Sequence, residues 1–158
     1  MFREMVRKNK QLPHEEALQL LKEEPRGVLS LQGDDGYPYG IPTNFWYCDA
    51  DGCIYFHGGK TGHKMDAIAR SPKASLCVIS RPIEVEDSWA PDYKSVIVFG
   101  RIELLEDTAA AMAIARDLSL QFTGDTGFIQ EQIELYGHET AVFRLVPEHI
   151  TGKRINES

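Results

Sequence analysis

The residues best suited to chemistry in this chain lie together in the segment His57–Lys64, which reads His-Gly-Gly-Lys-Thr-Gly-His-Lys. Its glycines allow the backbone to approach a ligand closely. Thr61 is expected to cap a helix, which places Gly62, His63 and Lys64 in the first helical turn. Unpaired backbone amides and two cationic side chains at a helix N-terminus are typical of a phosphate-binding site. A solvated basic turn is the alternative, and the residues alone leave both interpretations open.

Lys64 favours the phosphate interpretation, because a lysine at the N-terminus of a helix opposes the helix dipole. This opposition costs about 0.3–1 kcal/mol without a ligand, and a bound dianion would reverse it. The segment is also locally basic. Residues 57–73 hold four lysine or arginine residues against one aspartate, in a chain whose net charge is −7.

The sequence does not support three other kinds of site, because their motifs are incomplete or their residues are wrongly spaced. Gly59–Thr61 imitates the end of a phosphate-binding P-loop, but the first glycine of that motif is missing. Cys48, Cys53, His57 and His63 are residue types that bind zinc. However, Cys53 and His57 would be about 13 Å apart on one strand, too far to share a tetrahedral ion. The chain has no Gly-x-Ser-x-Gly elbow for a nucleophilic serine. We therefore expect neither a metal site nor a nucleophile.

The elements that position this segment are predicted from turn signals and hydrophobic periodicity. Helices are expected at residues 13–22, 61–71, 107–122 and 128–136. Strands are expected at residues 27–31, 37–47, 53–57, 74–80, 95–105 and 140–146, and a polar tail from Thr151 to Arg154 onward. The strands follow one another in hairpin order and do not alternate with helices. This order predicts a mainly β fold with flanking helices (α+β), built on an antiparallel sheet or small barrel.

Length and composition limit the class of protein. The 158 residues predict a single domain spanning 1–158. The net charge of −7 argues against a nucleic-acid partner. The longest apolar run has seven residues, against roughly 20 needed to span a membrane. Three cysteines are too few for a disulfide framework and favour a cytoplasmic protein with reduced thiols. Cys48 and Cys53 flank a predicted turn, so an occasional disulfide between them stays open.

Three motifs resemble the FMN-binding split-barrel superfamily, the group related to pyridoxamine 5′-phosphate oxidase. They are Gly36–Gly40 (Gly-Tyr-Pro-Tyr-Gly), the segment His57–Lys64, and Ser95–Gly100. Within that group the sequence is most similar to the 5-nitroimidazole-resistance (Nim-type) branch, and the resemblance covers most of the chain. It implies an antiparallel split β-barrel that forms a homodimer with FMN at the interface.

The resemblance also implies which residues contact the cofactor. They are Pro42, Thr43, Asn44, Phe45, Phe56, His57, Lys60, Gly62, His63 and Lys64. Trp89, Tyr93 and Ser95 are expected to reach the flavin of the other subunit.

The activity expected from this resemblance is oxidoreduction without pyridoxamine phosphate as the substrate. The predicted phosphate loop lacks the arginine- and lysine-rich character of the oxidase, and no oxidase-like closing segment follows Thr151–Arg154. A small electrophile such as a nitroaromatic would be the acceptor, and NADH or NADPH the reductant. His57 is the candidate proton donor, because imidazole titrates near neutral pH. It could equally be a hydrogen-bonding contact of the cofactor. A non-catalytic flavin store or sensor and a haem-binding protein are the alternatives.

Overall fold

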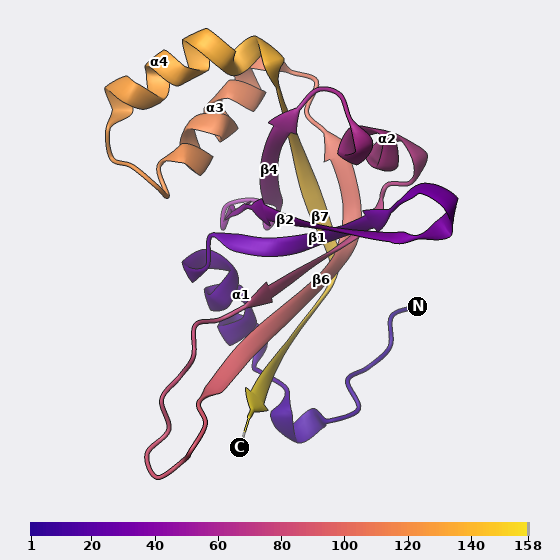
Figure 1. Cartoon of the computed structure of the whole chain (residues 1–158), viewed down its shortest axis with the longest axis vertical. Coiled ribbons are helices and arrows are strands. Elements are labelled where there is room, and N and C mark those ends of the chain that lie inside the picture. Colours follow the sequence, from indigo (N-terminus) through magenta and orange to yellow (C-terminus); the bar gives the residue numbers. More distant parts are fainter. Residues whose placement is uncertain (158) are drawn as a thin grey trace.

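The computed structural model describes residues 1–157, which form one curled antiparallel sheet with helices at its margins (Figure 1). The seven strands have the order β2-β1-β5-β6-β7-β4-β3. They are β1 Arg26–Gln32, β2 Pro38–Asn44, β3 Trp46–Tyr47, β4 Ile54–Gly59, β5 Lys73–Ile79, β6 Asp92–Leu104 and β7 Thr140–Asn156. The helices are α1 His14–Glu23, α2 His63–Arg70, α3 Thr108–Ser119 and α4 Thr126–Tyr136, with short 3-10 turns at Lys8–Lys10, Asp34–Gly36 and Gly137–Glu139. The predicted α+β class and antiparallel sheet are confirmed. The strands do not keep the expected hairpin order throughout, because β1 pairs with β5 and β4 pairs with β7.

Helix α1 forms where the sequence predicts it. Pro13 precedes the first helical residue, and two glutamates occupy the first turn, where they complement the helix dipole. Ala17, Leu20 and Leu21 form the apolar stripe, and all three are buried in the main core. The helix therefore ties the N-terminal part of the chain to the sheet.

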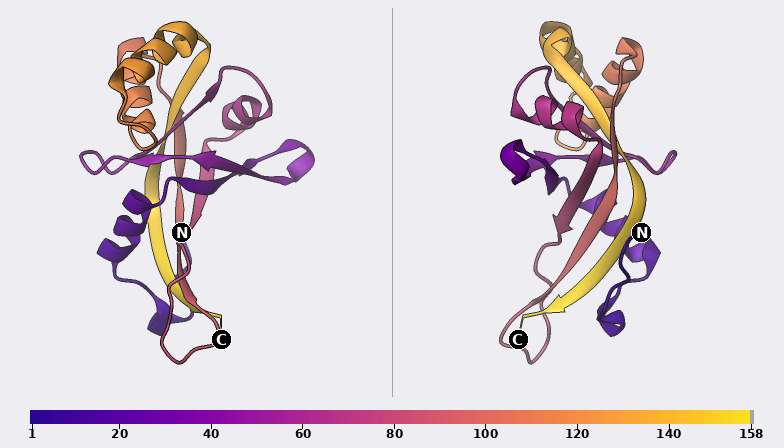
Figure 2. Two further views of the ribbon diagram at one scale, coloured as in Figure 1. Left: turned by 60° about the vertical axis from the view of Figure 1, so that its left-hand side comes forward. Right: turned by 90° about the vertical axis from the view of Figure 1, so that its right-hand side faces the viewer.

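The longest strands, β6 and β7, pair along almost their whole length and form the spine of the molecule. Figures 1 and 2 show α3 and α4 together at one end of these strands, and the β5–β6 loop at the other end. The register shifts between Phe99 and Gly100, where the strands contain a bulge. A Cβ atom at Gly100 would overlap the Val146 carbonyl oxygen, so the bulge requires glycine.

The predicted polar tail beginning at Thr151–Arg154 is wrong. Strand β7 continues through it to Asn156, and Lys153 pairs with Ser95. The buried Asp92 carboxylate holds the end of the strand by accepting hydrogen bonds from Arg154 (2.8 Å) and Asn156 (2.9 Å). Backbone pairing with β6 does not depend on apolar side chains, so a polar sequence continues the sheet here.

Strand β4 is buried on both faces. Ile54 and Phe56 enter the main core, together with Phe143 of β7. Cys53 and Tyr55 face the opposite way and pack in a second cluster with buried residues of α3. Because side chains alternate along a strand, His57 continues the row of Cys53 and Tyr55, on the side where α3 and α4 lie.

None of the helices in the described part of the chain is both long and apolar enough to cross a lipid bilayer.

Candidate functional site

A pocket of about 420 Å³ lies where the ends of three strands meet. It is lined by Arg26, Pro42, Thr43, Asn44 and His57. The pairing of Arg26 with Asn44 joins the start of β1 to the end of β2. His57 comes from the end of β4. The structure thus brings four of the predicted site residues together and adds Arg26, which sequence reasoning missed.

Lys64, in the first turn of α2, does not line this pocket, but its charge acts on His57, which does. Its ammonium group is 5.7 Å from the centre of the Phe143 ring. A Cβ atom at Gly58 would come within 3.2 Å of that ammonium nitrogen, so the glycine leaves the room that it occupies. Burial lowers the pKa of Lys64. Among residues 1–157, no carboxylate lies within 4.0 Å of it. A half-buried cation without an anionic partner is costly, and an anionic ligand would offset that cost.

The positive charge of Lys64 acts electrostatically on His57. The His57 side chain is exposed by surface area. Partial desolvation by the surrounding protein still lowers the pKa of its imidazole below the usual value of 6.5, and the nearby Lys64 cation lowers it further. The ring is therefore mostly neutral at pH 7. A neutral imidazole donates one hydrogen bond and accepts another, so His57 can hold or pass a proton at the pocket.

Helix α2 begins differently from the prediction. Its N-cap is Gly62, not Thr61, because the capping position has a φ of 119° that glycine adopts and threonine rarely does. Gly62 offers no side chain to the amides of the first turn. Those amides remain available as donors to an anion, as the predicted phosphate site requires.

His63 faces the turn between β1 and β2. Its ring stacks on Tyr39, with 3.9 Å between the ring centroids. Its Nε2 atom is 3.7 Å from a carboxylate oxygen of Asp34, which also pairs with Arg70. His63 and Lys64 are adjacent in the sequence, but they have different partners in the fold.

The remaining predicted contacts lie elsewhere. Phe45 and Phe56 are fully buried in the main core. Lys60 lines a separate cavity beneath α3 and α4. Trp89 is 84 % exposed in the β5–β6 loop. Tyr93 and Ser95, on β6, do not line the 420 Å³ pocket.

Metal ligands do not gather in the described part of the chain, where no group of three His, Cys, Asp or Glu side chains is placed to hold an ion. The three cysteines are unpaired. The thiol of Cys53 lies 3.8 Å from the carbonyl oxygen of Asp51, within the turn that precedes β4.

Comparison with known proteins identifies related sequences and folds. Residues 13–154 match the family described as pyridoxamine 5′-phosphate oxidase. A candidate 5-nitroimidazole antibiotic resistance protein from Bacteroides thetaiotaomicron shares the fold with a TM-score of 0.72 and 18% identity, over 91% of this chain and 86% of that one. An FAD-binding protein from Mycobacterium smegmatis has a TM-score of 0.67 and 20% identity, over 94% of this chain and 99% of that one. A flavocytochrome from Azotobacter vinelandii has a TM-score of 0.71 and 21% identity, over 91% of this chain and 68% of that one. No curated protein matches the sequence. The predicted split-barrel superfamily is confirmed.

Proposed function

Because this chain belongs to the pyridoxamine 5′-phosphate oxidase family, we propose that it is a flavoprotein that binds FMN and acts as an oxidoreductase. The acceptor in this proposal is a small electrophile such as a nitroaromatic, and the reductant is NADH or NADPH. Two similar structures are named for FAD binding or as a flavocytochrome, and a third for 5-nitroimidazole resistance. These names support a flavin and this class of acceptor.

The observation that carries the proposal is the half-buried ammonium of Lys64, which has no carboxylate partner in the described residues. One phosphate group would satisfy this cation, together with the uncapped amides that follow Gly62. Arg26 supplies a second cation at the adjoining pocket. These residues can hold a phosphate group, and FMN is the phosphate-bearing flavin that the family resemblance implies.

The roles of the chain's own residues follow from their positions. Lys64 and the first turn of α2 would hold the phosphate, while Pro42, Thr43 and Asn44 would lie along the rest of the cofactor. A flavin, when bound, supplies electron and hydride transfer, and the protein supplies orientation and protons. The imidazole of His57 lies at the pocket wall, where it can pass a proton to a reduced acceptor from one ring nitrogen while the other nitrogen takes up a proton from solvent.

We also propose a homodimer, formed by the outer face of the sheet. Val28, Ile79 and Ile97 project from that face, and each is at least 40% exposed. Val28 is paired with Pro42, a pocket residue, so the face reaches the edge of the 420 Å³ pocket. A second copy on this face would close the pocket with its own side chains. Trp89, Tyr93 and Ser95 remain the proposed contacts from that second copy.

The unpaired cysteines support a cytoplasmic location.

Replacing Lys64 with glutamine tests the phosphate site. Loss of a charge-assisted hydrogen bond costs about 1.5–3 kcal/mol. We therefore expect Lys64→Gln to weaken FMN binding about 10- to 150-fold, measured by calorimetry on protein stripped of cofactor and refilled. Lys73→Gln is the matched control, because Lys73 is an exposed lysine at the start of β5. Wild-type affinity in Lys64→Gln would refute the phosphate assignment.

A further inference from the structure

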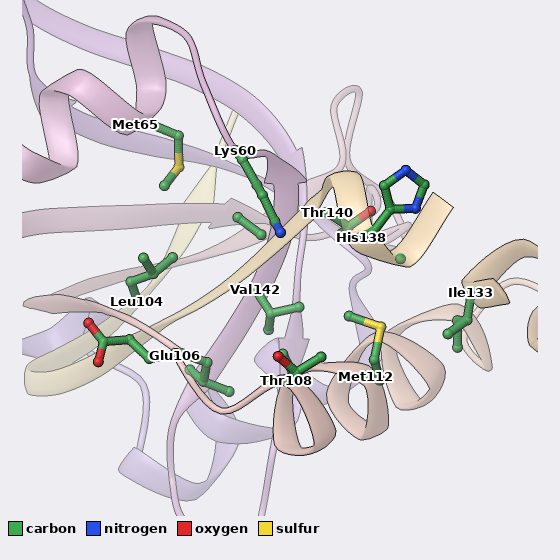
Figure 3. Close-up of a pocket in the computed structure, with 14 residues that line it drawn as sticks. Lys60, Met65, Leu104, Glu106, Thr108, Met112, Ile133, His138, Thr140 and Val142 are labelled. Atoms are coloured by element: carbon green, nitrogen blue, oxygen red, sulfur yellow. The ribbon is translucent and has the colours of Figure 1, made fainter. Parts of the chain in front are cut away.

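A cavity of about 540 Å³ lies beneath α3 and α4, apart from the pocket described above (Figure 3). Its volume falls within the range of about 300–1,000 Å³ that is typical of small-molecule sites. Its walls come from the β4–α2 loop, the end of β6, helix α3 and the start of β7. None of the roles given above to Lys64, His57 or Arg26 uses this space.

The lining combines apolar side chains with a single lysine. Leu105, Met112, Ile133 and Val142 are among the apolar groups. Figure 3 shows the Lys60 side chain extending from its loop into the cavity, toward Thr140 and Val142. Within residues 1–157, the Lys60 ammonium has no carboxylate within 4.0 Å.

The other charged groups of the lining do not neutralise this lysine. The Glu106 carboxylate points away from the Lys60 ammonium in Figure 3. The Nε2 atom of His138 lies 3.5 Å from Glu139, its own neighbour in the chain. The cavity thus has an apolar body and one cationic end.

A smaller cavity of about 170 Å³ extends this space toward His57. The two cavities share Met112, Ile133, Gly137 and Thr140 as lining residues, and the smaller one also includes His57. The two cavities therefore adjoin under α3 and α4, and His57, which lines the smaller one, also lines the 420 Å³ pocket.

We propose that this cavity binds a small apolar molecule that carries one carboxylate. The carboxylate pairs with the Lys60 ammonium, and the apolar body packs between α3 and the start of β7. Binding in this cavity does not require a flavin. Only the position of the apolar end, close to the redox centre through His57, rests on the proposed function.

Calorimetric titration of the purified protein, with whatever cofactor it carries, tests the proposal. The probes are 4-phenylbutyrate and its uncharged analogue 4-phenylbutyramide. We expect saturable binding of the carboxylate, tighter than that of the amide. Lys60→Gln should weaken carboxylate binding about tenfold or more, since it removes a charge-assisted contact, and should leave amide binding unchanged. Lys73→Gln is the matched lysine control.

A second pair of variants tests the location. Thr108 and Thr126 are each the first residue of a helix that follows an aspartate N-cap, but only Thr108 lines the cavity. Thr108→Trp should fill the space and abolish binding of both probes, whereas Thr126→Trp should bind like the wild type. The absence of saturable binding, equal affinity for acid and amide, or an unaltered Lys60→Gln affinity would overturn the proposal. FMN affinity separates the two hypotheses, because Lys60→Gln should leave it unchanged and Lys64→Gln should weaken it.

Discussion

At the scale of single residues, two neighbouring groups set the chemistry of the pocket. The Lys64 cation helps to lower the pKa of His57, and burial lowers the pKa of Lys64 itself. An arrangement that disfavours positive charge at both groups, with no carboxylate within 4.0 Å of Lys64 among residues 1–157, is unfavourable for stability. It becomes favourable when an anion binds. The same arrangement keeps His57 neutral, so one ring nitrogen can donate a proton while the other accepts one.

Removal of the lysine charge should raise the pKa of His57. We expect the Lys64→Met variant, stripped of cofactor, to show a higher pKa for the His57 imidazole, because a neighbouring positive charge no longer opposes protonation. The value should stay below 6.5, since desolvation by the surrounding protein is the larger cause of the shift. Nuclear magnetic resonance titration of the histidine ring protons measures this. Lys73→Met should leave the pKa unchanged, and a His57 pKa that does not respond to Lys64→Met would contradict the coupling.

At the scale of elements, the paired strands β6 and β7 hold the rest of the molecule in place. The bulge between Phe99 and Gly100 shifts the register of this pair, and a bulge of this kind bends the strands. Strand β7 then carries Val142, which pairs with His57, and Phe143, which lies under Lys64. The geometry of the proposed phosphate site therefore depends on a glycine far from it in the sequence.

Substitution of that glycine should destabilise the fold. We expect Gly100→Ala to lower the free energy of unfolding by about 1–3 kcal/mol, because the added methyl group overlaps the Val146 carbonyl oxygen. Gly40→Ala is the strand control, since its Cβ would meet Val28 at an ordinary 3.4 Å. Urea unfolding curves measure both variants. Equal stability of Gly100→Ala and the wild type would show that the bulge can relax.

Sequence alone predicted the elements that follow local patterns. Helix α1, the hairpin turn before β4 and the antiparallel sheet were all expected from capping, turn and periodicity signals. The pairing of β1 with β5 and of β4 with β7 was not expected, because it joins strands far apart in the sequence. The end of β7 was missed because its pairing with β6 depends on a partner about 60 residues away. Arg26 was missed for the same reason, since only the β1–β2 register places it opposite Asn44. Lys60 and Lys64 lie four residues apart in one segment, and only the fold shows that Lys60 lines the 540 Å³ cavity while Lys64 lies against Phe143 and Gly58.

At the scale of the whole molecule, the outer face of the sheet carries a row of exposed apolar side chains. Val28 pairs with Cys77, and Cys77 pairs with Ile97, so these side chains form a row across β1, β5 and β6. Phe2 extends the apolar surface by stacking on Phe99 and His149, with centroid distances of 5.5 and 5.0 Å. An exposed apolar row of this kind is typical of a protein–protein interface. A second copy of this chain is the occupant that the proposed function requires.

A charge placed in this row should dissociate the proposed dimer. We expect the wild-type protein to sediment as a dimer at micromolar concentration and Ile97→Lys to sediment as a monomer, because the interface would bury an unpaired cation. Leu135→Lys is the control, since Leu135 is exposed on α4, away from the sheet face. Sedimentation equilibrium distinguishes the two states. A monomeric wild type, or a dimeric Ile97→Lys variant, would contradict the assignment of this face.

The most direct measurement of the flavin proposal is the visible absorption spectrum of the freshly purified protein, followed by calorimetric titration with FMN. We predict a yellow protein with flavin bands, or a colourless one that takes up one FMN per chain. Mixing it with NADH or NADPH without oxygen should then bleach the flavin if the chain is an oxidoreductase. A preparation that lacks flavin bands and does not bind added FMN would contradict the proposal at its foundation.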